Sequence, residues 1–294
     1  MRPRRPSSPG VAVLAALAVL LLAPAEPAAM QESGEPAPLA GGIPRLESAA
    51  AQLAYARGLK GAIAAGEGEE RERRTRLAVA AFRAVYELHP AAKELGAEAA
   101  FRAGELLRAA ERSSAALVEF ERAASRGGGT AFRARAGLEI GHVHRREGRP
   151  ARALEAYLAV AADSDADPEH QDDAWLWAGT VWRDRGRVAE ARRAWRSVAE
   201  GARSPLDRIR AFDLLAETWI DAGDLEAAAG ALDECRRALA PLALEETRTG
   251  DEVRQALQRM HTVSALPRAI AERDAARRRG DVRSRSRHGT PRIP

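Results

Sequence analysis

Apolar residues recur at spacings of three and four over residues 47–263, and the breaks in this pattern fall at glycine or proline. That spacing places apolar side chains on one face of an α-helix, which has about 3.6 residues per turn. Aromatic residues make up only 4% of the chain, and β-branched residues are too scarce for a large sheet. The pattern predicts an all-α protein and argues against an all-β fold and a doubly wound α/β enzyme.

A segment of 37 or 38 residues occurs five times in this helical region. Every copy has an alanine at the same place, at steps of 38, 37, 38 and 37 residues, and a large apolar residue four positions later. We expect each copy to be two antiparallel helices, with a glycine at the turn because glycine tolerates positive φ. The aligned alanines are Ala78, Ala116, Ala153, Ala191 and Ala228, and the turn glycines are Gly148, Gly186 and Gly223.

The first half of each copy matches its neighbours as well. The fourth copy has Trp175, Ala178, Gly179 and Trp182 before its turn, and the fifth has Phe212, Leu215, Ala216 and Trp219. This order resembles the tetratricopeptide repeat (TPR) family, whose pattern is W-x2-L-G-x2-Y, then A-x3-F, then P. The resemblance covers about 220 residues. It implies an α-solenoid of about five TPR-like helix pairs closed by a C-terminal capping helix.

The repeat also predicts how the helices pack. Small residues at 104, 141, 179 and 216 let the paired helix approach closely, and no single pair buries its own apolar face, so the stack is the stable object. We expect a capping helix at 251–263, with an apolar stripe of Val253, Leu257 and Met260. The rings expected to fill the space between units are Phe120, Tyr157, Trp182, Trp195 and Trp219.

The first copy is irregular. Its first helix is expected at about 47–65, and the charged stretch GEGEERERR follows where the other copies have a tight turn. Its second helix keeps Ala78 and Phe82 and ends before Pro90. We expect a longer, charged connection at this place.

The N-terminal 25 residues have the features of a secretory signal. Three arginines precede an apolar run at 11–22, and Ala-Pro-Ala at 23–25 supplies a cleavage pattern. The run is shorter than the roughly 20 residues that span a bilayer. We therefore expect an exported protein, periplasmic or extracellular, with an uncleaved inner-membrane anchor as the alternative. The predicted segments are a signal peptide at 1–25, a Pro/Gly/Ala-rich linker at 26–45, the repeat domain at 46–265, and a short polar helix from Pro267 with a basic tail at 266–294.

The formal net charge of +4 is unevenly distributed. Residues 276–294 hold seven arginines and one acidic residue. This tail has almost no apolar side chains to offset its ordering entropy, so we expect it to be disordered. Such a tail can touch nucleic acid, anionic lipid or an acidic protein, but export argues against nucleic acid, and a solubilising tail is the simpler interpretation. A membrane partner is expected only if the signal is retained.

Few residues point to metal chemistry. His142 and His144 are two apart on a predicted helix and point about 200° apart, so they cannot share one ion. Asp163, Asp165 and Asp167 alternate as in a calcium loop, but Pro168 stands where that loop needs glycine and Ala174 where it needs glutamate. We predict no metal site, and expect His144 to be a packing residue while His142 faces the groove.

Catalytic motifs are also lacking in the sequence. The three glycines at 127–129 follow no predicted strand and precede no Lys-Ser or Lys-Thr, so they indicate a linker between repeats rather than a phosphate loop. The single cysteine, Cys235, excludes an internal disulfide and is expected to be buried. No Ser/His/Asp or Cys/His set stands out. We therefore predict a protein that is not an enzyme and has no cofactor.

In the TPR family the first helix of each unit lines a groove that binds a peptide or partner helix. Carried over by position, the resemblance implies a row of guanidiniums beside apolar residues, suited to an acidic partner with apolar anchors. The alternative is that arginine is simply the commonest polar residue here, since 44 of the 46 basic residues are arginine. The implied groove residues are Glu98, Phe101, Glu105, Arg108, Arg135, Leu138, His142, Arg145, Asp173, Leu176, Thr180, Arg183, Arg210, Asp213, Glu217 and Ile220.

These observations together favour a non-catalytic protein-interaction scaffold of the cell envelope. A membrane-anchored adaptor and an accessory subunit of an envelope enzyme are the alternatives.

Overall fold

The computed structural model describes residues 42–126 and 131–287, and every regular element in these ranges is a helix. The predicted signal peptide, most of the predicted linker, the glycines at 127–129 and the last seven residues lie outside them. The described residues belong to one compact unit. The prediction of an all-α fold is confirmed. No helix in the described ranges is long and apolar enough to cross a membrane.

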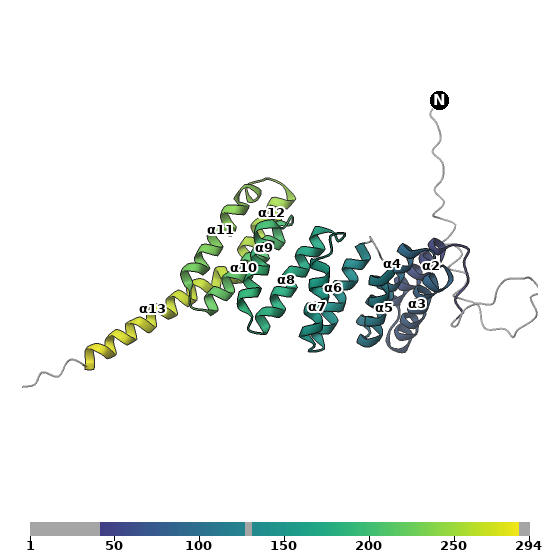
Figure 1. Ribbon diagram of the computed structural model, residues 1–294, viewed down its shortest axis with the longest axis horizontal. Coiled ribbons are helices and arrows are strands. Elements are labelled where there is room, and N and C mark those ends of the chain that lie inside the picture. The colour runs from purple at the N-terminus through teal and green to yellow at the C-terminus, as the bar shows by residue number, and fades with distance from the viewer. Residues whose placement is uncertain (1–41, 127–130, 288–294) are drawn as a thin grey trace, which may run out of the picture. The chain divides into compact units, whose positions relative to one another are not determined.

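Ten of the helices form five pairs that follow one another in chain order (Figure 1). Each helix packs against the next one in the chain, and successive first helices also touch each other. A short connection joins the two helices of each pair, so these two helices run antiparallel. The first helices are α2 (Ala49–Gly61), α4 (Lys93–Ala109), α6 (Ala131–Arg146), α8 (Pro168–Asp184) and α10 (Pro205–Asp221), and their partners are α3 (Gly68–Leu88), α5 (Ser113–Arg126), α7 (Pro150–Ala161), α9 (Val188–Gly201) and α11 (Leu225–Ala243).

Local signals in the sequence set where these helices begin. Asp224 accepts a hydrogen bond from the amide of Ala227, and Ser204 caps α10 in the same way through Asp207. Such a side chain satisfies one of the amides that a helix N-terminus leaves unpaired. Proline opens α7, α8 and α10, where its missing N–H costs nothing.

The turns inside four of the pairs share one conformation. Gly148, Gly186 and Gly223 have φ of 68°, 73° and 75°, which confirms the predicted role of these glycines. Glu111 holds the equivalent position in the second pair with φ of 60°. In each turn the amide of the next residue bonds the carbonyl five residues earlier, as from Arg112 to Leu107 at 2.9 Å. This pattern ends a helix with one left-handed residue, which glycine adopts without strain.

Glu111→Gly should therefore stabilise the protein, by about 0.5–1 kcal/mol. Glu111 is exposed and holds a left-handed conformation, which is unfavourable for a residue with a side chain. Glycine adopts this conformation without that cost, and the three matching turns show that it fits there. The change is measured by urea unfolding followed by circular dichroism. Gly148→Ala is the matched reverse change and should destabilise, and equal effects of the two substitutions would contradict the strain argument.

Close packing inside each pair depends on a small residue under a large ring. A Cβ added at Gly104, Gly141 or Gly179 would lie 2.6, 2.3 and 2.3 Å from the nearest ring atom of the partner helix. Those rings belong to Phe120, Tyr157 and Trp195, all fully buried. The predicted close approach is thus confirmed, but these rings pack inside their own units and do not only fill the space between units. Trp182 and Trp219 are half-buried.

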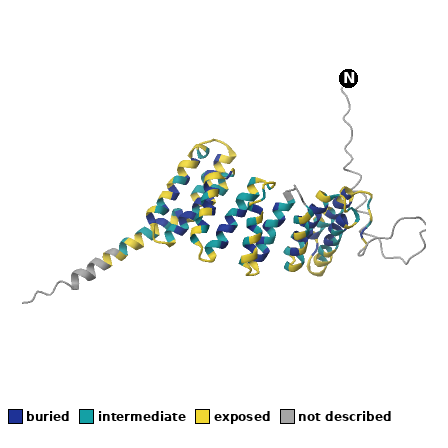
Figure 2. Cartoon of the chain, in the orientation of Figure 1, coloured by how far each residue is buried: buried dark blue, intermediate teal, exposed yellow. Residues whose placement is uncertain are grey.

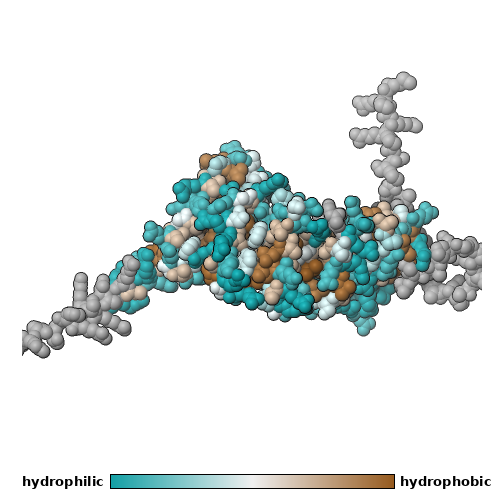
Figure 3. All heavy atoms as spheres, in the orientation of Figure 1, coloured by the Kyte–Doolittle hydropathy of each residue, from teal (hydrophilic) through white to brown (hydrophobic). Residues whose placement is uncertain are grey.

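Buried side chains line the surfaces between neighbouring helices, whereas exposed residues gather at the turns (Figure 2). On the face drawn in Figure 3, hydrophobic side chains appear in separate patches and hydrophilic ones cover much of the rest. This arrangement is the expected result of helices with one apolar face stacked in a row.

The first unit differs from the prediction at the stretch GEGEERERR. The residues from Gly68 onward are helical, so α3 begins ten residues before Ala78, whereas the other second helices begin three residues before their aligned alanines. Glu70 pairs with Arg73 and Arg74 one turn away, and their hydrogen bonds lower its pKa to about 2. Charge pairs at this spacing, together with two glutamates in the first turn, favour helix in a sequence that lacks apolar residues.

The C-terminal end also corrects the prediction. The expected capping helix at 251–263 is α12 (Arg248–Arg259), and Met260 is a buried connector rather than part of it. The next helix, α13 (His261–Arg287), begins before Pro267 and continues through residues 276–287, which we predicted to be disordered. Alanine and arginine, both strong helix formers, make up much of this segment and outweigh its shortage of apolar residues.

Candidate functional site

The first helices α4, α6, α8 and α10 each present one side to solvent. We call this side the first-helix face, and it carries Glu105, Arg108, Arg135, Arg145, Arg183, Arg210 and Glu217. The predicted apolar anchors Phe101, Leu138 and Leu176 do not lie on it, because they are only 2%, 7% and 0% exposed. They pack in the core between neighbouring helices. The prediction that they anchor a partner is therefore wrong in position.

Asp213 occupies the equivalent place in the last unit. Its carboxylate accepts hydrogen bonds from the amides of His261 and Thr262, both at 3.0 Å. These amides belong to the start of α13, so the carboxylate serves as its cap. In the other units, the buried apolar residue at this position contacts the first helix of the next unit. In the described part of the chain, no first helix follows the last unit. Asp213 instead attaches α13 at the end of the array.

Most predicted charged residues of the face pair with a neighbouring first helix. Arg108 lies 3.2 Å from Glu139, and Arg183 donates to Glu217 at 2.9 Å. Glu105 accepts from Lys60 at 3.1 Å. Each pair joins one unit to the next, so two members of the predicted guanidinium row are already neutralised.

The arginines at the centre of the face are arranged differently. The guanidinium of Arg145 lies 4.8 Å from the ring centre of Trp177, and that of Arg210 lies 5.0 Å from it. Arg210 also approaches Asp173 at 3.5 Å. Arg135, the remaining predicted arginine, lies 4.6 Å from the ring centre of Phe101. The structure thus brings Arg145 and Arg210 together on one half-buried indole from the helix between them.

Trp177 is not among the predicted groove residues. It stands one position after Leu176, in the register shared by Arg102, Glu139 and Leu214. Two of these four positions carry a charged residue, Arg102 and Glu139. A position with Arg and Glu in two units faces solvent more readily than one with Phe and Leu, so this pattern was the available signal that the Trp177 register is exposed. The resemblance alone pointed to the neighbouring register.

His142 and Tyr157 complete the surroundings of Trp177. The Nδ1 atom of His142 lies 2.7 Å from the hydroxyl of Tyr157, and its ring meets the indole edge-on at 4.9 Å between centres. Burial, followed by the positive charge of Arg145, lowers the pKa of His142 to about 4. His142 is therefore held neutral against the aromatic rings. Thr180, also predicted for the groove, donates its hydroxyl to the carbonyl of Leu176.

Stability should fall as the pH drops from about 6.5 towards 4. His142 binds a proton near pH 6.5 when unfolded but only near pH 4 when folded, so its full contribution exists above pH 6.5 and is lost below it. We expect a loss of about 1 kcal/mol between pH 7 and pH 5, after allowing for the solvent that still reaches the ring. Urea unfolding at the two pH values measures it. His142→Gln should remove that part of the pH dependence, and an unchanged difference would contradict the assignment.

We refer to His142, Arg145, Tyr157, Asp173, Trp177 and Arg210 as the Trp177 cluster. It combines a large aromatic surface with two guanidiniums and a half-buried carboxyl, Asp173, whose pKa is raised by burial. Side chains of these types, Trp, Tyr and Arg, carry most of the binding energy in many protein interfaces. The cluster is therefore suited to an apolar side chain beside an acidic group.

The other candidate residues have structural surroundings. Burial raises the pKa of the Cys235 thiol to about 12, and His144 is buried as predicted. Asp163 pairs with Arg133 at 2.5 Å, and Asp167 caps α8. Within the described ranges, no three His, Cys, Asp or Glu side chains lie close enough together to hold a metal ion.

The helix pairs, their 37- or 38-residue step and their shared turns define the architecture. It is a TPR-like α-solenoid. No protein-family model and no curated protein matches the chain.

Solved TPR structures are similar to it at low identity. MamA is 15% identical, with a TM-score of 0.48 over 67% of this chain and 97% of MamA. A putative kinesin light chain of P. anserina with TPR-like repeats is 14% identical, with a TM-score of 0.48 over 68% of this chain and all of the other. YrrB, described as a TPR protein with an unusual peptide-binding site, is 21% identical, with a TM-score of 0.45 over 65% of this chain and 86% of YrrB.

Proposed function

We propose that this protein is a non-catalytic scaffold that binds a protein segment on its first-helix face, with the Trp177 cluster as the central contact. One observation carries the proposal: the guanidiniums of Arg145 and Arg210 meet on one half-buried indole. Arg210 also approaches Asp173, whereas Arg145 has no ion-pair partner among the described residues. Arg108 and Arg183 are held by carboxylates of the next unit instead and do not contact this indole.

The chemistry of the cluster defines the partner class. The indole edge offers apolar contact area, and the guanidiniums offer hydrogen bonds that match a carboxylate in a planar, two-pronged way. The surrounding ion pairs are partly exposed and contribute little by themselves. We therefore expect the bound segment to place an apolar side chain on Trp177 and an acidic residue beside Arg145 and Arg210.

Selection from a displayed library of random peptides tests this directly. We expect enrichment of sequences with Asp or Glu beside a large apolar residue, and Trp177→Ala should weaken their binding at least about tenfold. The double change Arg145→Ala, Arg210→Ala should have a similar effect, measured by calorimetric titration of one selected peptide.

Arg183→Ala is the matched control, because Arg183 lies on the same face but pairs with Glu217. It should change the affinity by less than about threefold. Equal losses for Arg183→Ala and Arg145→Ala would contradict a central role for the cluster. Unchanged binding by Trp177→Ala would overturn the proposed site.

We further propose that the scaffold works outside the cytoplasm. The arginines, apolar run and Ala-Pro-Ala pattern of residues 1–25 support export and cleavage. N-terminal sequencing of the protein recovered from the envelope fraction tests this. A start at Glu26 or Met30 supports a free exported scaffold, whereas an intact Met1 in the membrane fraction supports the membrane-anchored adaptor. Co-purification with one envelope enzyme in fixed ratio would favour an accessory subunit.

A further inference from the structure

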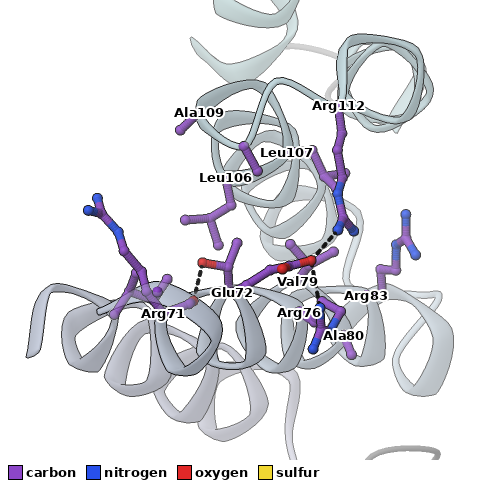
Figure 4. A pocket seen from close by; sticks show the side chains of 14 residues that line it. Arg71, Glu72, Arg76, Val79, Ala80, Arg83, Leu106, Leu107, Ala109 and Arg112 are labelled. Carbon is purple, nitrogen blue, oxygen red and sulfur yellow. Dashed lines mark hydrogen bonds and ion pairs between the residues drawn. The ribbon is translucent and has the colours of Figure 1, made fainter. Parts of the chain in front are cut away.

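A hollow lies between the extended α3 and α4. Residues of α3 between Gly68 and Arg83 line one side, and the C-terminal end of α4 with the turn after it lines the other. Ile63 of the short helix η1 (Ala62–Ala65) also contributes. The cavity has a volume of about 770 Å³. In Figure 4, Leu106 and Leu107 point from α4 towards α3, with Arg71 at one end and Arg112 at the other.

The lining of the hollow has two parts. Its inner surface is aliphatic, made by Ile63, Val79, Ala80, Leu106 and Leu107. Its rim carries arginines, of which Arg71, Arg76 and Arg112 are exposed. An aliphatic floor under a cationic rim fits a ligand with an apolar body and an anionic head.

The charges on the rim do not balance. One oxygen of Glu72 receives both Arg76, at 2.6 Å, and Arg112, at 2.8 Å. Arg83 is directed to Glu119 instead. Arg71 has no ion-pair partner among the described residues. The rim therefore keeps about two uncompensated positive charges, enough for one carboxylate or phosphate group.

The polar groups also distinguish between kinds of ligand. Thr75 is the one hydroxyl in the lining, and it already donates to the carbonyl of Arg71. The aliphatic residues of the inner surface have no polar side-chain atom that could pair with a peptide backbone. A peptide backbone lying over these residues would gain no hydrogen bond from them, whereas an aliphatic chain needs none. A monoacyl molecule needs only one anionic contact and aliphatic surface.

We propose that this hollow binds a small amphiphilic anion, a single carboxylate or phosphate head on an aliphatic chain. The head lies between Arg71 and the Arg76–Arg112 pair, and the chain covers Leu106, Leu107 and Val79. This site is independent of the Trp177 cluster, which belongs to other units.

Calorimetric titration of the protein with monomeric dodecanoate tests the site. We expect saturable binding, and a shorter octanoate should bind at least about tenfold more weakly, because fewer methylenes are buried. Arg71→Ala should weaken dodecanoate binding at least about fivefold, and Arg71→Ala with Arg112→Ala further. Arg73→Ala is the matched control, since Arg73 is on the same helix, exposed and paired with Glu70, and should leave binding unchanged.

Equal binding of dodecyltrimethylammonium would overturn the proposal, because the rim would then select no charge. Equal affinity of the Arg71→Ala and Arg73→Ala variants would do the same. Dodecyl phosphate in place of dodecanoate distinguishes the two head groups, and tighter binding of either supports the site. Capture of the protein by anionic phosphatidylglycerol vesicles without binding of the monomeric probe would identify a surface effect and overturn the pocket. Peptide binding at the Trp177 cluster should be unaffected by these variants.

Discussion

Trp195→Ala should lower the free energy of unfolding by about 3–5 kcal/mol. Trp195 is the largest fully buried side chain in the described ranges, and its ring lies against Gly179 of the paired helix. Its indole N–H also donates to the carbonyl of Leu176 at 3.0 Å. Alanine would leave a cavity between α8 and α9 and one buried carbonyl without that partner. Urea unfolding followed by far-ultraviolet circular dichroism measures the loss without depending on tryptophan fluorescence.

Leu244→Ala is the surface control, because Leu244 is 81% exposed and should change stability by less than about 0.5 kcal/mol. A loss after Trp195→Ala no larger than that of the control would show that the ring does not hold the pair together.

The fifth unit offers a sharper version of the same argument. It has Ala216 and Leu232 where the fourth has Gly179 and Trp195. Alanine is larger than glycine, and leucine is smaller than tryptophan, so the two changes compensate each other in volume. Gly179→Ala alone should cost about 1–3 kcal/mol, since its Cβ would lie 2.3 Å from the indole. After Trp195→Leu the same change should be neutral or stabilising. Additive effects of the two substitutions would contradict direct packing between them.

These contacts could be predicted because they depend on spacing within one helix pair. A glycine or alanine and a large apolar residue sixteen positions later recur in four units, with a ring at the second position in three of them, and the helix period places them opposite each other. The turn glycines were predictable for the same reason. In each case the repeat itself supplies several copies of one local geometry.

The binding face was harder to predict, because it depends on how first helices of different units cross. Leu176 and Trp177 differ by one position, about 100° around the helix. The angle between neighbouring first helices decides which of the two side chains is covered. That angle cannot be deduced from the spacing of residues in the sequence. The α3 extension was missed for another reason, since its helix is held by charge pairs rather than by an apolar stripe.

The end of the array left a signal in the sequence. Asp213 stands in the register of Phe101, Leu138 and Leu176, and a carboxylate there could not pack like an apolar residue. The exception marks the unit that has no following first helix. What the sequence could not show was its partner, because the amides of α13 lie 48 and 49 residues away along the chain.

Replacing both Arg83 and Arg122 with alanine should lower the free energy of unfolding by about 3–5 kcal/mol. The two guanidiniums hold Glu119, whose side chain is fully buried, at 2.8 and 3.0 Å. Tyr86 also donates its hydroxyl to that carboxylate at 2.9 Å. Without the arginines, a buried charge would keep only one neutral donor, and such a charge is strongly unfavourable in the interior. Urea unfolding at pH 7 measures the effect.

Glu119→Ala added to the double variant should restore most of the lost stability. Alanine is the residue that the other four units have at this position, namely Ala81, Ala156, Ala194 and Ala231. If the triple variant were as unstable as the double one, the loss would come from missing arginine packing and not from the stranded carboxylate. Arg236→Ala, which removes an exposed pair with Asp233, should cost less than about 1 kcal/mol. Rescue would mean that Glu119 makes the junction of the first two units dependent on two arginines, whereas the junctions with alanine depend on apolar packing.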